Sequence, residues 1–232
     1  MAHLRGKVVL IAGASTGIGR EVALQAARRG ASALVVSARS AERLETLAEQ
    51  IRAVGARCCV TAVDATDAAA VEASLAAAEA EVGPIDVALL NIGAGPEYHL
   101  ATATAEQITA AMRVNYDVTV NYLAPLTARM RGRGGLIAHT NSLAGLIGVP
   151  MQGPYSAAKA AVRILLDTYR TELRGSGIRF LAIYPGFVAT DRTHDDGIPA
   201  PFEISTEECA ARVIRAWNPA AVTSPSPGRP PP

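Results

Sequence analysis

The stretch KVVLIAGASTGIGR, residues 7–20, combines a short apolar run, a glycine-rich turn and the beginning of a helical pattern. After Lys7 the run is apolar and rich in β-branched residues, which is typical of a strand buried on both faces. Glycines at 13, 17 and 19 allow a tight turn and a close approach of the backbone to a ligand. The helix that follows offers unpaired N–H groups and a positive dipole end, which suit a pyrophosphate. These features predict a nucleotide-binding strand–turn–helix unit; the alternative is a glycine-rich turn without a ligand.

Beyond this unit, short apolar runs continue to alternate with longer helical patterns. We expect strands at residues 7–12, 33–37, 57–63, 87–92, 134–140 and 179–184. We expect helices at residues 20–29, 41–54, 67–82, 104–130, 154–174 and 205–217, and a short seventh strand at 220–223. Such alternation predicts an α/β fold in which helices cover both faces of a parallel sheet.

The composition fits one soluble domain. The chain has 232 residues, of which half are hydrophobic and 19% are charged, and this length is sufficient for one full core. Its 22 basic and 21 acidic residues and its 4% aromatic content disfavour a nucleic-acid partner. No apolar run approaches the ~18 residues of a spanning helix, so we expect no membrane partner and a cytoplasmic protein. We assign residues 1–223 to the domain and expect the proline-rich residues 224–232 to be a disordered tail.

No metal site is predicted. The three cysteines, Cys58, Cys59 and Cys209, have neither the number of a disulfide framework nor the spacing of a zinc site. An acidic group with one histidine occurs at residues 191–196, but a solvated loop is the expected structure there.

Four polar residues outside the glycine turn complete a recognisable pattern. Tyr155 and Lys159 lie four residues apart in YSAAK, which places both on one face of a helix. Ser142 precedes Tyr155 by thirteen residues, and Asn115 lies in the long helix before it. With the G-x-x-x-G-x-G turn, these residues make the chain resemble the short-chain dehydrogenase/reductase family over about residues 5–218. The resemblance implies a single-domain, Rossmann-type doubly wound sheet of about seven strands, in the order 3-2-1-4-5-6-7.

The resemblance also implies where a dinucleotide cofactor would lie. Asp64, after the third expected strand, would contact the adenine amino group. Asn91 and Gly93 match the second Asn and the Gly of the family's Asn-Asn-Ala-Gly, although Leu90 replaces the first Asn. The other cofactor-binding residues implied by the glycine turn, by the helix with YSAAK and by the segment that covers the nicotinamide are Gly13, Ser15, Thr16, Gly17, Ile18, Gly19, Tyr155, Lys159, Pro185, Gly186, Val188 and Thr190.

The choice between NAD(H) and NADP(H) depends on the end of the second strand. A carboxylate there usually holds the ribose hydroxyls of NAD, but this chain has Ser37-Ala38-Arg39-Ser40. A guanidinium suits a 2′-phosphate through charge-assisted hydrogen bonds. We therefore expect NADP(H) to be favoured over NAD(H), with Arg39 and Ser40 at the phosphate. The alternative is an exposed Arg39 that points to water.

The resemblance assigns each of the four polar residues a role in carbonyl reduction. A free tyrosine has a pKa of about 10, and a nearby ammonium lowers that pKa. Tyr155 would be the general acid in reduction and the general base in oxidation, and Lys159 would tune it and hydrogen-bond the nicotinamide ribose. Ser142 would donate to the substrate oxygen, where negative charge develops. Asn115 would hold a water that links Lys159 to solvent.

Residues 94–101, 143–153 and 191–204 are expected to select the substrate. The contacts expected there are Glu97, Tyr98, His99, Met151, Gln152 and His194. His139, on the fifth expected strand, is predicted to be a core histidine with satisfied hydrogen bonds. The helices around Asn115 and Tyr155 suggest a homodimer, with a tetramer as the alternative.

The whole pattern favours an NADP(H)-dependent oxidoreductase that interconverts a ketone and a secondary alcohol. A catalytically idle NADP-binding redox sensor or scaffold is the alternative, which the intact set of four polar residues disfavours. An epimerase or dehydratase of this kind usually carries a larger carboxyl-terminal substrate domain. A methyltransferase would have no use for Tyr155 and Lys159.

Overall fold

The computed structural model describes residues 4–95, 97–190 and 201–218. In this part of the chain, the main sheet is six-stranded and parallel, in the order β3-β2-β1-β4-β5-β6. Its strands are β1 (Val8–Ala12), β2 (Ala33–Ala38), β3 (Arg57–Ala62), β4 (Val87–Leu90), β5 (Gly135–Thr140) and β6 (Ile178–Ile183). The α/β fold class and the predicted order of these strands are confirmed. The expected seventh strand at 220–223 and the tail at 224–232 lie outside the described residues, and the domain bounds stay a prediction.

The strand order reverses at β1, which pairs with β2 on one side and with β4 on the other. Because all strands of the sheet are parallel, their carboxyl ends lie along one edge. The loops after β1 and β4 leave this edge toward opposite faces, which is where open α/β sheets bind their ligands. The topology therefore places the glycine turn beside the segment that follows β4.

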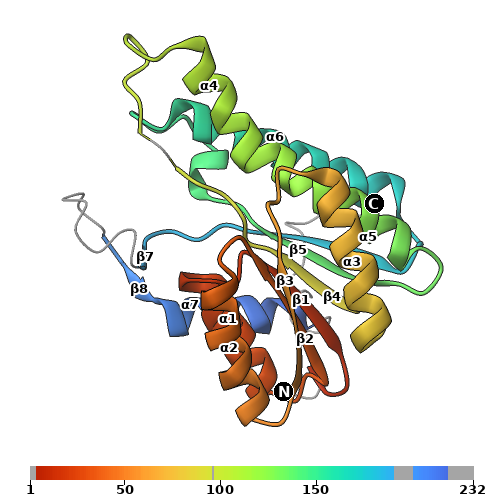
Figure 1. The fold of residues 1–232 in the computed structure, drawn as a ribbon. Helices are drawn as coiled ribbons and strands as arrows, with labels where there is room; N and C mark the ends of the chain where they lie inside the picture. Colours follow the sequence, from red (N-terminus) through yellow and green to blue (C-terminus); the bar gives the residue numbers. More distant parts are fainter. Residues whose placement is uncertain (1–3, 96, 191–200, 219–232) are drawn as a thin grey trace, which may run out of the picture.

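Helices cover both faces of the sheet (Figure 1). Val9 and Ile11 of β1 point to one core, while Val8 and Leu10 point to the other, as the alternation of a strand requires. The first core contains α1 (Gly17–Arg28), α2 (Ala41–Ala53) and α7 (Thr206–Trp217), and the second contains α3 (Ala68–Val82), α5 (Val118–Met130) and α6 (Gly153–Glu172). Burial on both faces explains why the strands read as continuous apolar runs.

The helix expected at 104–130 has three parts. α4 (Ala105–Met112) begins at a capping box, in which Thr104 and Gln107 bond each other's backbone. A π-helical turn, η2 (Arg113–Asp117), follows it and leads into α5. The prediction of one regular helix is therefore wrong at its centre. The periodicity of apolar residues is too coarse to detect one wide turn within a helix.

The remaining ends of the expected elements move by no more than three residues. The largest shift is at α1, which begins at Gly17 because the Arg20 N–H already donates to the Thr16 carbonyl within the glycine turn. A parallel pair, β7 (Val188–Ala189) and β8 (Ile204–Ser205), was not predicted. Two-residue strands are too short to leave an alternating pattern in the sequence. This pair joins the segment after β6 to the start of α7.

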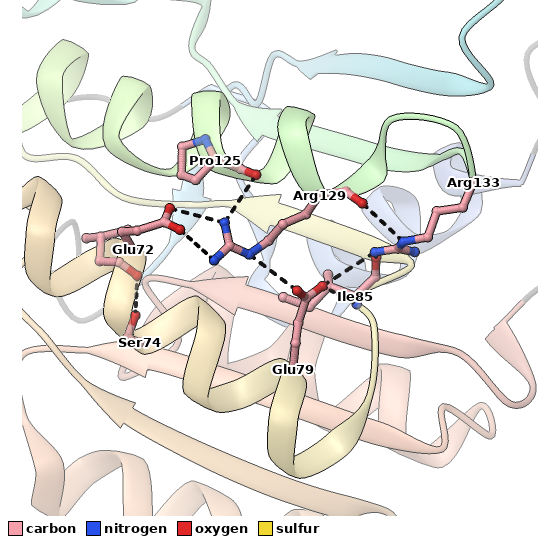
Figure 2. A network of polar contacts seen from close by, with 8 residues as sticks. Glu72, Ser74, Glu79, Ile85, Pro125, Arg129 and Arg133 are labelled. Atoms are coloured by element: carbon pink, nitrogen blue, oxygen red, sulfur yellow. Dashed lines mark hydrogen bonds and ion pairs between the residues drawn. The ribbon is translucent and has the colours of Figure 1, made fainter.

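A network of ion pairs fastens α3 to the end of α5 (Figure 2). Arg129 lies between two carboxylates of α3, at 2.7 Å from Glu72 and 3.3 Å from Glu79. Glu79 also meets Arg133 at 3.4 Å and accepts from the Ile85 N–H at 3.0 Å. Only 16% of the Arg129 side chain is exposed, so water screens this network less than an ordinary surface pair.

We expect Arg129→Met to lower the free energy of unfolding by about 1–3 kcal/mol, because charged hydrogen bonds of this kind are lost together. The partly buried carboxylate of Glu79 is then left with Arg133 alone among its basic neighbours. Urea unfolding of both proteins measures the difference. Arg212→Met is the matched control, since its pair with Glu208 on α7 is well exposed. The control should change the free energy by less than about 0.5 kcal/mol, and an equal effect of both variants would contradict the prediction.

Candidate functional site

A cavity of about 760 Å³ opens at the carboxyl edge of the sheet. It is lined by the glycine turn, the ends of β2 to β5 and the segment after β6. Of the residues expected to bind a cofactor, it brings together Gly13, Ser15, Thr16, Gly17, Ile18, Arg39, Ser40, Asp64, Asn91, Gly93, Tyr155, Pro185, Gly186, Val188 and Thr190. Ser142 lines the same cavity, whereas Gly19, Asn115 and Lys159 lie behind its surface. One continuous space therefore joins the expected cofactor end to the expected chemical end.

The glycines of the turn serve close backbone packing. Gly13 has a φ of +86°, and a Cβ there would lie 2.5 Å from the Asn91 carbonyl oxygen. A Cβ at Gly19 would lie 2.1 Å from the Gly13 carbonyl oxygen. The Asn91 amide donates to that same oxygen at 3.4 Å, which ties the end of β4 to the turn. Gly19 is therefore needed for the shape of the turn although it does not face the cavity.

The start of α1 is open to an anion. Thr16, at its N-cap, makes no side-chain hydrogen bond to the helix, and the first turn carries no acidic residue. The positive end of the helix dipole therefore lies at the cavity without a carboxylate to neutralise it. Together with the close-packed glycines, this end of the cavity fits a pyrophosphate.

Two arginines, the predicted Arg39 and also Arg43, lie after β2 at the cavity. Arg39 lines the cavity with an exposed side chain, and Arg43, one helical turn further along, lines it as well. Ser40 caps α2 by accepting from the Arg43 N–H at 3.4 Å, and its hydroxyl hydrogen is not used in that bond. Sequence reasoning missed Arg43, although the spacing i, i+4 from Arg39 would have indicated it.

Asp64 forms a local turn beside these cations. Its Oδ1 accepts from the N–H and the hydroxyl of Thr66, both at 2.9 Å. These two hydrogen bonds, and then the charge of Arg39, hold the pKa of the Asp64 carboxyl below its usual value. Asp64 therefore stays ionised at the rim of the cavity.

Asn115 is fully buried in the π-helical turn, and its side chain is engaged with backbone. Its Oδ1 accepts from the Ala94 N–H at 3.1 Å, and its Nδ2 donates to the carbonyls of Ala94 at 2.7 Å and Ala111 at 3.0 Å. A Cβ at Gly93 would lie 2.6 Å from the same Oδ1. Asn115 therefore clamps the loop that follows β4, and its expected role as a water holder stays a prediction.

Lys159 is buried in a slot between β5 and α6, with 3% of its surface exposed. Its Nζ donates to the Thr140 carbonyl at 3.0 Å and lies 5.6 Å from the centre of the Tyr155 ring. Burial lowers the pKa of Lys159 from 10.5 to about 8. Tyr155 itself is partly exposed to the cavity. The pair thus combines an accessible phenol with a desolvated ammonium.

Ser142 and Asn141 shape the opposite wall. Ser142 begins the short 3₁₀ helix η3 (Leu143–Gly145), and its Oγ accepts from the Ala144 N–H at 3.2 Å. Asn141 donates to the Lys159 carbonyl at 3.1 Å and accepts from the Ser142 N–H at 2.8 Å. Asn141 therefore fixes Ser142 relative to α6. Sequence reasoning missed it, and its place directly before Ser142 is the only signal that the sequence offers.

Two of the three segments expected to select the substrate, residues 94–101 and 143–153, meet at one point. The Tyr98 N–H donates to the Met151 carbonyl at 2.7 Å, which joins the loop after β4 to the segment after η3. Glu97 and His99 are exposed, and Gln152 lies at the start of α6. His194 lies outside the described residues.

His139 differs from its prediction. It is buried as expected, but its Nδ1 has no hydrogen-bond partner among the described residues. The prediction of a satisfied core histidine is therefore right for burial and for Nε2, which bonds the Thr119 hydroxyl, but wrong for Nδ1. A sequence pattern shows that a residue is in the core but not whether both of its ring nitrogens find partners.

Neither a metal cluster nor a membrane-spanning helix is found among the described residues. No group of histidine, cysteine, aspartate and glutamate side chains there could hold a metal ion. Crossing a bilayer would take a longer and more apolar helix than any in residues 4–95, 97–190 and 201–218.

The reversed strand order, the glycine turn and the cavity define a dinucleotide-binding protein of the Rossmann type. The chain matches the short chain dehydrogenase family over residues 7–198. It is 32% identical to an uncharacterized oxidoreductase of Myxococcus xanthus over 210 residues, which are 90% of this chain and 82% of that protein. It is 33% identical to the 3-oxoacyl-[acyl-carrier-protein] reductase FabG of Staphylococcus aureus over 81% of this chain and 76% of that protein.

Among solved structures, an alcohol dehydrogenase from the archaeon Thermococcus sibiricus, complexed with 5-hydroxy-NADP, matches with a TM-score of 0.81 and 30% identity. The match covers 89% of this chain and 88% of that one. This chain belongs to the short-chain dehydrogenase family. It is accordingly a carbonyl or alcohol oxidoreductase that uses a nicotinamide dinucleotide and a small-molecule substrate.

The lowered pKa of Lys159 makes stability depend on pH in a defined direction. Below about pH 8 both the native and the unfolded state carry the charge, and the native state bears the full cost of burying it. Between about 8 and 10.5 the unfolded chain binds more protons than the native one, so rising pH stabilises the native state. We expect the free energy of unfolding of the wild type, minus that of Lys159→Met, to increase from pH 8 to pH 10. Urea unfolding across this range measures the difference, and a constant or falling value would contradict the buried charge.

Proposed function

We propose that this protein is an NADP(H)-dependent ketone reductase in which Tyr155 is the general acid. The observation that carries the proposal is the shared cavity, which exposes Tyr155 and Ser142 at one end and the glycine turn at the other. The buried ammonium of Lys159, 5.6 Å from the Tyr155 ring centre, supplies the electrostatic support that this role requires.

The residues around the cavity fit the cofactor. The open start of α1 and the glycine turn would hold its pyrophosphate, and Val188 and Thr190 would hold the nicotinamide carboxamide. NADP(H) is favoured because Arg39 and Arg43 both line the cavity where a 2′-phosphate would lie, and β2 ends without a carboxylate. The name of the Thermococcus structure, a complex with 5-hydroxy-NADP, is consistent with this choice.

The cofactor, when bound, supplies the hydride that adds to the carbonyl carbon. Ser142 holds the substrate oxygen through its hydroxyl, and Tyr155 donates the proton that this oxygen takes up. Lys159 remains largely protonated at neutral pH, because its pKa is about 8, and its charge favours the Tyr155 phenolate that is left behind. Asn115 keeps the loop after β4 in place around this set through its bonds to Ala94.

Removal of the Tyr155 hydroxyl tests the chemical part of the proposal. We expect Tyr155→Phe to lower kcat for ketone reduction by about 10²–10⁴-fold, because a positioned general acid contributes that much. NADPH binding should change little, since the ring and the Lys159 slot remain. Steady-state NADPH oxidation with a panel of ketones, and calorimetric titration of NADPH, measure the two effects. A wild-type protein that binds NADPH tightly and reduces no ketone would instead support an idle sensor or scaffold.

Charge removal at the end of β2 tests the cofactor preference. We expect Arg39→Ala and Arg43→Ala each to weaken NADPH binding by about 1.5–3 kcal/mol, the worth of a charged hydrogen bond, and to leave NADH binding nearly unchanged. Arg52→Ala is the matched control, because Arg52 lies at the carboxyl end of α2, the helix that carries Arg43, and away from this cavity. Calorimetric titration of the wild type and each variant with NADPH and with NADH measures these affinities. Equal affinity of the wild type for NADH and NADPH would overturn the preference.

The proposal extends to the cellular location and the oligomeric state of the enzyme. We place it in the cytoplasm and expect a homodimer formed through the helices that carry Asn115 and Tyr155. Ile164, 55% exposed on α6, supports the use of this helix in an interface. Light scattering coupled to size exclusion measures the assembly directly.

A further inference from the structure

His139 occupies a central place beneath the site that the mechanism above does not use. It pairs in register with Leu90 of β4 and with Ala182 of β6, near the carboxyl end of β5. Its side chain is fully buried. It points to the same face as Ile137, toward the helices that carry Asn115 and Lys159.

The hydrogen bonds of the Thr119 hydroxyl define the orientation of the ring. This hydroxyl donates its only hydrogen to the Asn115 carbonyl at 2.8 Å. It also lies 3.4 Å from Nε2 of His139. Since the hydroxyl has no second hydrogen, Nε2 must be the donor and the hydroxyl oxygen the acceptor. The ring is therefore the tautomer with hydrogen on Nε2, and Nδ1 has only a lone pair.

Packing alone does not explain a histidine at this position. Nδ1 is buried and has no partner among the described residues, and an unpaired buried acceptor is destabilising. Burial and then the charge of Lys159 hold the pKa of His139 well below its ordinary value, so the ring is neutral. A leucine would fill such a space without leaving a buried acceptor unpaired. The contact made by Nε2 is therefore the feature that a histidine adds here.

The Thr119 hydroxyl holds a backbone that is irregular. Asn115 lies in the π-helical turn, where the Val118 N–H bonds back to Arg113 rather than to the residue four before it. Threonine in a helix divides between two rotamers, of which one bonds the preceding turn. The N–H of His139, 3.4 Å from the hydroxyl oxygen, favours that rotamer. It thereby fixes the Asn115 carbonyl, and with it the amide that clamps Ala94 beside Lys159 and Tyr155.

We propose that His139 is a positioning residue, which holds Asn115 in place through the hydroxyl of Thr119. The inference rests on the proposed function, because turnover is one of its two readouts. According to this proposal, a residue in the core of β5 controls the loop after β4, although His139 does not line the cavity.

The first test compares variants of His139 in ketone reduction. We expect His139→Leu to lower kcat by about tenfold, the size of a typical coupling between residues in contact, while the KM for NADPH stays unchanged. His139→Gln, which retains a donor at the end of the side chain, should restore most of the loss. Thermal unfolding confirms that each variant folds. Full activity in His139→Leu, or equal losses in both variants, would overturn the proposal.

The second test asks whether His139 acts through Thr119. We expect Thr119→Val to lower kcat as much as His139→Leu, and the double variant to lose no more than either single one. Thr127→Val is the matched control, because its buried hydroxyl likewise bonds the carbonyl four residues earlier on the same helix, that of Leu123, at 2.7 Å. The control should leave kcat unchanged. Losses that multiply in the His139 and Thr119 double variant would show that the two residues act independently.

The second readout, hydrogen exchange, does not depend on activity. The Ala94 N–H is protected by the Asn115 side chain, so its hydrogen exchange, followed by NMR, reports the clamp directly. We expect exchange about tenfold faster in His139→Leu and in Thr119→Val, but not in Thr127→Val. If the wild type reduces no ketone, the proposed function fails and this exchange still decides the positioning role. Unchanged exchange in both variants would overturn it.

Discussion

A desolvated ammonium between β5 and α6 is the constraint around which the site is arranged. A buried charge is costly unless it is hydrogen-bonded, and the Lys159 ammonium donates one hydrogen bond to the Thr140 carbonyl at the end of β5. The slot is narrow. A Cβ at Gly93 would lie 3.3 Å from the Lys159 Nζ, and one at Gly145 would lie 3.1 Å from the Lys159 Cβ. Glycine at both positions therefore leaves the room that the lysine occupies, and Tyr155, one helical turn before it, is placed by the same helix.

The neighbourhood of this lysine is built largely by amide side chains that bond backbone. Asn115 clamps the loop after β4, Asn141 links β5 to α6, and Asn91 links β4 to the glycine turn. Each amide replaces bonds that a regular strand or helix would provide, because these segments leave the sheet at irregular angles. The result is a cavity with a rigid wall on the side of the sheet.

The likeness to known enzymes and the details of the cavity carry different information. Family membership and a TM-score of 0.81 to an alcohol dehydrogenase establish the type of protein and its fold. Individual side chains carry the more specific proposals, such as Arg39 and Arg43 after β2 and the histidine beneath Asn115. His139 illustrates the point. Its position in the core followed from the alternation of β5, but its unpaired nitrogen and its contact with Thr119 depend on how α5 crosses the sheet.

The order of the six described strands was implied by the resemblance to the family. The sequence by itself determined the class of fold and the set of polar residues at its carboxyl edge. It could do so because period-2 and period-3.6 patterns, glycine spacing and the four-residue step from Tyr155 to Lys159 are local properties of the chain. Tertiary structure alone decided the π-helical turn at Asn115, the bonds that Asn141 makes to α6, the short pair of β7 and β8 and the lowered pKa of Lys159. These features arise where segments far apart in the chain meet, and the free energy of such contacts depends on burial and on partners that no local pattern records.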